Sequence, residues 1–126
     1  MYDPDVIVYH HRRPLFIPHM KQVFNVGMHR GFFFKKYPKT SRQLFYIQPT
    51  VLTLGFWFLF VWSFYSLPVR IMFLGTFTLF YCLAVFSVIK KVTLGESLLV
   101  SVGIILTHMA YGTGFVKGLL TKHLKQ

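Results

Sequence analysis

The feature that most restricts the fold of this chain is Leu44–Ser66, a run of 23 residues without a charged side chain. As an α-helix this run would be about 34 Å long, enough to cross the hydrocarbon core of a bilayer. Tyr46 lies near one end, and Trp62 and Tyr65 lie near the other. Aromatic side chains prefer the two membrane–water interfaces, so the run predicts a transmembrane helix.

Two further uncharged runs follow, Ile71–Ile89 and Leu98–Val116, and each is closed by lysine. The connection Ser66–Arg70 contains a proline and predicts a tight turn, so the first two helices should form a hairpin. We therefore expect an all-α membrane protein with about three transmembrane helices, near residues 44–66, 71–89 and 98–116. Apolar helices in a soluble core would need a polar shell, and only 13% of the residues are charged.

The composition indicates the same class and bears on partners. Hydrophobic residues make up 54% of the chain, and soluble domains typically carry about a quarter charged residues. The net charge of +11 does not predict nucleic-acid binding, because the cations border apolar runs. It favours membrane lipids with anionic headgroups, or phosphates of a lipid-linked ligand. The single cysteine, Cys82, lies within the second run and cannot form an intrachain disulfide.

The distribution of Lys and Arg predicts the orientation. With the N-terminus inside, ten cations lie on the inner side and four on the outer side, and the positive-inside rule favours this arrangement. The N-terminus has acidic residues where a signal peptide would have basic ones. Three lysines near the C-terminus fall on the outer side, so a re-entrant third segment stays open as an alternative.

Residues 14–42 form a basic segment directly before the first apolar run. A helix beginning at Pro18 would place Met20, Phe24, Gly27 and Gly31 on one side, with polar residues opposite. This pattern is typical of an amphipathic helix in the membrane interface. An amphipathic helix packed on a soluble core is the alternative, which the following apolar runs make less favourable.

The first 13 residues contain a β-type run, Val6–Tyr9, which is too short to be stable without partner strands. It predicts the last strand of a sheet whose other strands are not in this chain. Asp3 and Asp5 have the D-x-D spacing of a metal site, but the proline between them predicts a turn, and we assign no metal.

Other candidate side chains have two interpretations. The run His10, His11, Arg12 and Arg13 could bind a diphosphate, because guanidinium groups pair with phosphate oxygens, or could anchor the chain to anionic lipid. His108, in the third run, is either a functional intramembrane group or a structural one with a hydrogen-bonded ring.

Glycine spacing near the end of the third run predicts close helix packing. Gly114 and Gly118 have the small-xxx-small spacing that lets two helix backbones approach each other. The same stretch is not a phosphate-binding loop, because Lys117 stands where that motif requires its third glycine.

The sequence resembles the C-terminal part of bacterial family 2 glycosyltransferases, of the membrane-attached type used in exopolysaccharide and lipid-linked glycan assembly. The resemblance lies in Asp-Pro-Asp-Val-Ile-Val-Tyr-His-His-Arg-Arg at residues 3–13, in Gln22, Gly27 and Arg30, and in the final His108-Met-Ala-Tyr-Gly-Thr-Gly-Phe.

The resemblance implies a nucleotide-sugar-binding α/β domain before residue 1, with a catalytic base and a divalent cation that this chain does not supply. It implies that residues 10–13 lie near the donor diphosphate, and that Gln22 and Arg30 lie on the acceptor side. It further implies a bacterial inner-membrane location with the N-terminus in the cytoplasm. The predicted function is therefore the membrane-anchoring, acceptor-side part of an inverting glycosyltransferase, inactive by itself. The alternative is a small non-catalytic membrane scaffold that binds a partner enzyme.

Overall fold

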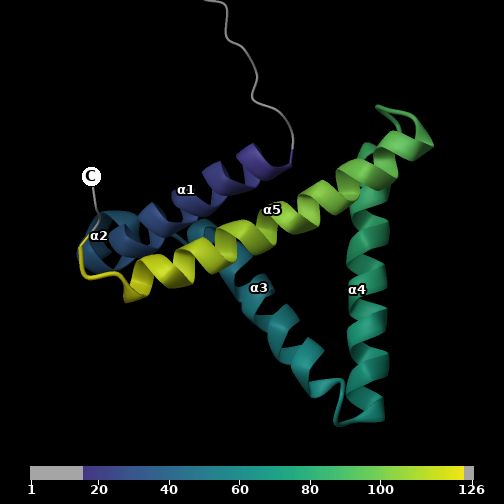
Figure 1. Cartoon of the computed structure of the whole chain (residues 1–126), viewed down its shortest axis with the longest axis horizontal. Coiled ribbons are helices and arrows are strands. Elements are labelled where there is room, and N and C mark those ends of the chain that lie inside the picture. The colour runs from purple at the N-terminus through teal and green to yellow at the C-terminus, as the bar shows by residue number, and fades with distance from the viewer. Residues whose placement is uncertain (1–15, 124–126) are drawn as a thin grey trace, which may run out of the picture.

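The computed structural model describes residues 16–123, which form five helices. The predicted strand Val6–Tyr9, the Asp3–Asp5 turn and the candidate site at residues 10–13 lie outside the described residues. The helices are α1 (Ile17–Lys36), α2 (Pro38–Ser41), α3 (Leu44–Trp62), α4 (Leu67–Val88) and α5 (Leu94–Leu120), shown in Figure 1. Three of them, α3, α4 and α5, are long and apolar enough to cross a membrane. The expected all-α membrane fold is thereby confirmed.

The connection between α3 and α4 lies four residues earlier in the chain than the sequence indicated, at residues 63–66. We expected the second apolar helix to begin at Ile71, after a charged residue, but α4 begins at Leu67 with a proline in its first turn, a position that suits proline. Arg70 therefore lies inside the helix, and its Nε donates a hydrogen bond to the carbonyl oxygen of Ser63 at 3.0 Å. The cation consequently closes the tip of the α3–α4 hairpin.

The α3–α4 hairpin is held together by aromatic rings. Phe56 of α3 lies 5.3 Å from Phe73 and 6.0 Å from Phe77 of α4, between ring centroids. Phe60 adds a second contact with Phe73 at 5.7 Å. Such ring pairs stabilise a contact beyond the area that they bury, so side chains rather than backbones join these two helices.

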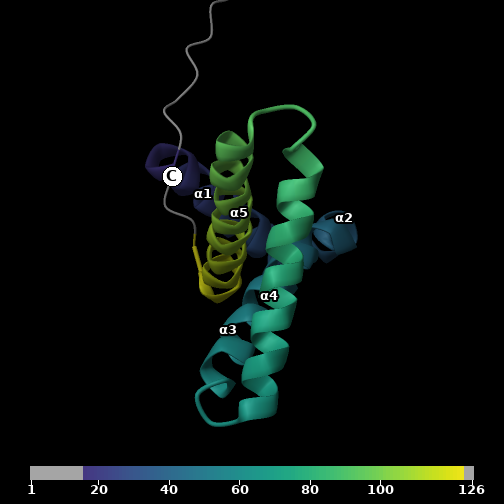
Figure 2. The same cartoon turned by 90° about the vertical axis from the view of Figure 1, so that its right-hand side faces the viewer.

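Helices α1 and α5 lie side by side and run parallel (Figures 1 and 2). As expected, α1 has Pro18 in its first turn and buries Gly27 and Gly31. That face packs against α5, whereas an isolated interface helix would leave it to lipid. A Cβ at Gly27 would overlap the backbone of Tyr111, and a Cβ at Gly31 would overlap the backbone of Phe115. The two helices therefore touch backbone to backbone.

The glycine pair of α5 completes this contact, which we call the α1–α5 seam. A Cβ at Gly114 would overlap the carbonyl of Phe24, and a Cβ at Gly118 would overlap that of Met28. The small-xxx-small interpretation of Gly114 and Gly118 is thus confirmed by their closeness to α1. Each helix contributes two glycines four residues apart, which is the spacing that permits close helix approach.

Helix α5 also connects the seam to the hairpin. Its N-terminus has a capping box, in which the Thr93 hydroxyl accepts from the Glu96 amide and the Glu96 carboxylate accepts from the Thr93 amide. Near its start α5 meets the end of α4, where Ser97 and Ser101 are fully buried and the Tyr81 hydroxyl donates to the Leu98 carbonyl at 3.4 Å. From this contact with the end of α4, α5 extends away from α4 at a large angle (Figure 1).

Candidate functional site

A polar groove runs along the face of α1 that points away from α5. We call it the α1 groove, and it is lined by Gln22, Asn25, Val26, His29, Arg30 and Phe33. Gln22 and Arg30, the two acceptor-side candidates, are eight residues apart, so slightly more than two helical turns place them on the same face. The structure therefore brings both predicted residues into one groove and adds an amide and an imidazole.

Arg30 is oriented by the start of α3. Its guanidinium carbon lies 4.3 Å from the ring centroid of Tyr46, within the range of a cation–π contact. This contact fixes the plane of the guanidinium and leaves Arg30 exposed. The arrangement suits recognition of a phosphate or carboxylate, because an oriented guanidinium offers paired N–H donors.

His29 is the second group of the groove with hydrogen-bonding capacity. Its Nδ1 lies 2.7 Å from the backbone carbonyl of Asn25, and because a carbonyl oxygen only accepts, Nδ1 donates this hydrogen bond. The Asn25 side chain is exposed beside it. The α1 groove thus combines a guanidinium with side chains that can form hydrogen bonds, and such a surface can bind a ligand.

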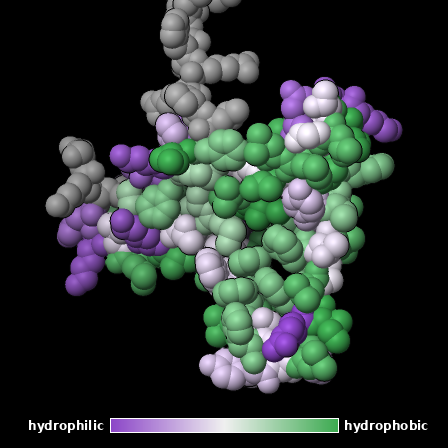
Figure 3. All heavy atoms as spheres, turned by 45° about the vertical axis from the view of Figure 1, so that its right-hand side comes forward, coloured by the Kyte–Doolittle hydropathy of each residue, from purple (hydrophilic) through white to green (hydrophobic). Residues whose placement is uncertain are grey.

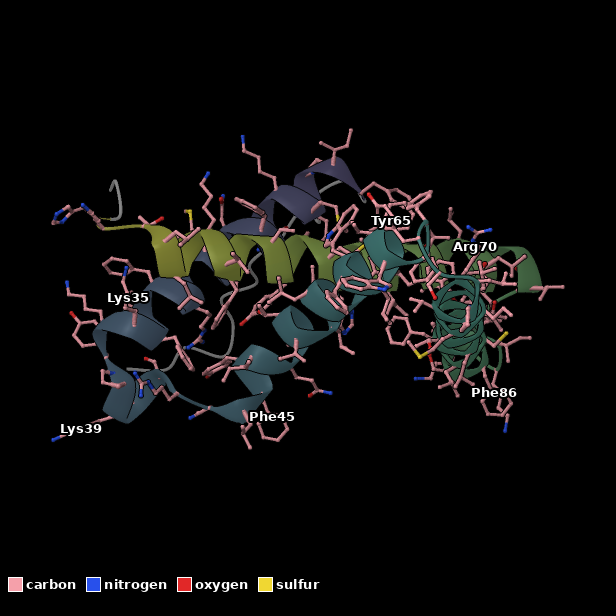
Figure 4. All side chains as sticks on the ribbon, turned by 90° about the horizontal axis from the view of Figure 1, so that it is seen from below. Lys35, Lys39, Phe45, Tyr65, Arg70 and Phe86 are labelled. Carbon is pink, nitrogen blue, oxygen red and sulfur yellow. The ribbon has the colours of Figure 1, made fainter. Side chains whose placement is uncertain are left out.

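A basic corner lies where α1 meets α2, with Lys35, Lys36, Lys39 and Arg42 all exposed. Figure 3 shows hydrophilic residues gathered at this end, and Figure 4 shows Lys35 and Lys39 there, far from the hairpin tip. Lys35 donates to the carbonyls of Leu119 (2.8 Å) and Thr121 (2.7 Å), which closes the C-terminus of α5.

His108 has a structural environment. Its Nδ1 donates to the carbonyl of Ile104 at 2.9 Å, one turn earlier in α5. Its own carbonyl accepts from the Thr53 hydroxyl at 3.0 Å, and its ring packs edge-on against Phe80 at 6.0 Å. The backbone of His108 thus contacts α3 and its ring contacts α4, as expected for a histidine with a satisfied hydrogen bond inside an apolar bundle.

Glu96 is the only carboxylate side chain among residues 16–123. It accepts from the amide and the hydroxyl of Thr93, at 3.0 and 2.7 Å. Within this range no three His, Cys, Asp or Glu side chains come together. The described residues can therefore bind and orient a ligand, and they offer no free carboxylate base.

Comparison of the chain with protein-family models, with curated proteins and with solved structures found no match. The sequence indicated Gln22 and Arg30 only through resemblance, and it did not single out Asn25 and His29. Asn25 lies three residues after Gln22 and four residues before His29, and this helical spacing is the signal that could have found them.

Proposed function

We propose that this chain is the membrane-anchoring, acceptor-side part of an inverting family 2 glycosyltransferase. The enzyme would transfer a sugar from a nucleotide sugar to a lipid-linked or polysaccharide acceptor in the bacterial inner membrane. The observation that carries the proposal is the α1 groove, in which Gln22 and Arg30 share one exposed helix face. The resemblance at residues 3–13 and 108–115 supports it from the sequence.

In an inverting transfer, an acceptor hydroxyl attacks the anomeric carbon, a carboxylate base takes its proton, and the nucleoside diphosphate leaves. The base and a divalent cation belong to the nucleotide-sugar domain that the resemblance implies. The role of this chain is to hold the acceptor beside that domain. An exposed guanidinium over Tyr46 suits the phosphate of a lipid-linked acceptor.

The binding role is tested with a radiolabelled polyprenyl diphosphate and the full chain in nanodiscs. We expect saturable binding that Arg30→Lys weakens by about tenfold to a hundredfold, since lysine keeps the charge but loses the planar fork. Arg42→Lys is the matched control, because Arg42 is also exposed and also lies over a ring, Phe34, at 5.5 Å. Equal binding by both variants would reject the acceptor role of Arg30.

The proposal also predicts the coding sequence around this chain. We expect a nucleotide-sugar-binding domain encoded upstream of Met1, in frame or separated by a frameshift. In membranes that contain only this chain, we expect no sugar transfer above background. Turnover by the isolated chain would reject the division of roles given above.

A small non-catalytic scaffold is the second candidate, favoured by the polar face of α1, which could dock a protein. Affinity purification from the source membrane distinguishes the two. A scaffold would bring down a separately encoded enzyme, and its binding of polyprenyl diphosphate would not depend on Arg30.

A further inference from the structure

Because the α1–α5 seam joins the two helices backbone to backbone, α1 and α5 must take the same position relative to the membrane. Gly27 faces Tyr111 and Gly31 faces Phe115, so residues of α1 lie beside residues 84 positions later in α5. His19 and Met20 accordingly line the same cleft as Gly103 and His108. If α5 crosses a bilayer, α1 must cross at the same depth.

The exposed face of α1 is unsuitable for that depth. Lys21, Gln22 and Asn25 are exposed, and the offsets of 84 and 90 residues across the seam place them beside residues 105–115, in the central and following turns of α5. A crossing would turn these polar side chains toward the hydrocarbon core. Cationic and amide side chains that face lipid at mid-membrane are strongly disfavoured.

Ten of the eleven Lys and Arg residues within residues 16–123 lie away from the hairpin tip. In Figure 3 the hydrophilic residues lie at the left and at the upper right, and a small patch lies near the bottom, at the hairpin tip. Arg70 is the cation at that tip. The ten others of residues 16–123 belong to α1, α2, α5 and the segments beside them: Lys21, Arg30, Lys35, Lys36, Lys39, Arg42, Lys90, Lys91, Lys117 and Lys122.

The α3–α4 hairpin is long enough to cross the hydrocarbon core, and its tip carries exposed aromatic side chains. Helix α4 has 22 residues, or about 33 Å, close to the thickness of the hydrocarbon core. Trp62 and Tyr65 are exposed at its far tip, at 52% and 84%, as expected for interface aromatics. The hairpin extends away from the α1–α5 pair, which lies across its open end (Figures 1 and 2).

We propose that α1 and α5 together form a platform that lies along one membrane surface and contacts anionic lipid headgroups, and that only the α3–α4 hairpin crosses. The length and composition of α5 are compatible both with a crossing and with a position along the membrane surface. The polar face of α1, which is joined to α5 by the seam, favours the surface. Both ends of residues 16–123 then lie on the same side, and ten of the eleven cations meet headgroups there. This proposal concerns the lipid partner and does not depend on the glycosyltransferase assignment.

The test is labelling with a membrane-impermeant maleimide in sealed vesicles of known orientation. Single cysteines are placed in the full chain in a Cys82→Ala background, by Tyr65→Cys at the tip, Val92→Cys before α5 and His123→Cys after it. We expect Val92→Cys and His123→Cys to react from the same side, and Tyr65→Cys from the other. Reaction of His123→Cys from the side of Tyr65→Cys would overturn the proposal.

Trypsin digestion of the unmodified protein is a second test of this topology, and it requires no substitutions. Trypsin should cleave after Lys91 and after Lys122 in vesicles of the same orientation. If one site were cleaved only in right-side-out vesicles and the other only in inside-out vesicles, the platform would be overturned.

Headgroup contact is measured separately, by the lipid that the protein retains after extraction from an equal mixture of phosphatidylglycerol and phosphatidylcholine. We expect preferential retention of phosphatidylglycerol, reduced about fivefold for each charge removed in Lys36→Gln and Lys39→Gln. Equal retention of the two lipids by the unmodified protein would overturn the headgroup contact.

Discussion

The α1–α5 seam and the α3–α4 hairpin are two helix contacts built in opposite ways. In the seam four glycines bring backbones together, and no side chain can be added at these positions without overlap. In the hairpin the backbones are kept apart by the rings of Phe56, Phe60, Phe73 and Phe77. The seam depends on shape at four positions, whereas the hairpin depends on many weak ring contacts.

The difference has a physical origin. Within lipid there is little hydrophobic gain from joining two apolar helices, so the packing of the rings supplies the attraction in the hairpin. Rings can fill the space between two helices whose outer faces remain apolar. Helix α1 has a polar outer face, and it needs a narrow, strong contact to stay in register with α5. The seam should therefore be far more sensitive to single substitutions than the hairpin.

The largest effect is expected from Gly31→Leu, which inserts a side chain into the backbone of Phe115. We expect a loss of about 3 kcal/mol in the free energy of unfolding, because a rigid backbone cannot move aside. The measurement is reversible unfolding of the full chain in detergent by denaturant. Gly75→Leu is the matched control, since a Cβ at Gly75 meets nothing within 4 Å. Equal effects of the two substitutions would show that α1 does not pack on α5 in this way.

A smaller effect is expected from Phe56→Leu in the hairpin. The substitution removes ring contacts with Phe73 and Phe77 but keeps an apolar side chain, so the expected loss is about 1 kcal/mol. The same unfolding measurement applies, with Phe86→Leu as control because Phe86 is 69% exposed and points outward in Figure 4. A loss larger than that of Gly31→Leu would reverse the proposed order of the two contacts.

A local effect at the start of α5 is expected from Thr93→Ala. The substitution removes the hydroxyl that caps the first turn and should cost about 1 kcal/mol. We expect the first turn to fray while the seam, which begins 18 residues further along the helix at Tyr111, stays intact. Hydrogen exchange of α5 amides checks this, and faster exchange throughout the helix would contradict it.

The smallest effect is expected from Lys35→Met. The Lys35 ammonium donates to two carbonyls at the C-terminus of α5, but the side chain is exposed, so the loss should be about 0.5 kcal/mol. Lys36→Met is the control, because Lys36 lies over the rings of Phe32 and Tyr37 instead. A lower melting temperature for Lys35→Met than for Lys36→Met would support the capping role of Lys35. Identical melting curves for the two variants would contradict that role.

The apolar runs predicted the three long helices because uncharged length is a local property that the sequence displays directly. Pro18 and the apolar side of α1 could be predicted for the same reason. The partner of that side could not, because glycine spacing shows that a helix can approach another backbone and does not say which one. Gly27 and Tyr111 are 84 residues apart, and their contact is visible only in three dimensions. For the candidate site, the sequence predicted which face of α1 carries Gln22. It did not predict that Tyr46 orients Arg30.

Helices α1 and α5 are parallel and in contact, and pairs of spin labels on the two helices test this arrangement. In a Cys82→Ala background, labels at His19→Cys and Leu99→Cys should show strong dipolar broadening, because both residues line one cleft. Labels at His19→Cys and Leu120→Cys should show none, since 21 residues of helix separate the α5 sites by about 31 Å. Broadening in the second pair, or its absence from the first, would contradict the parallel seam.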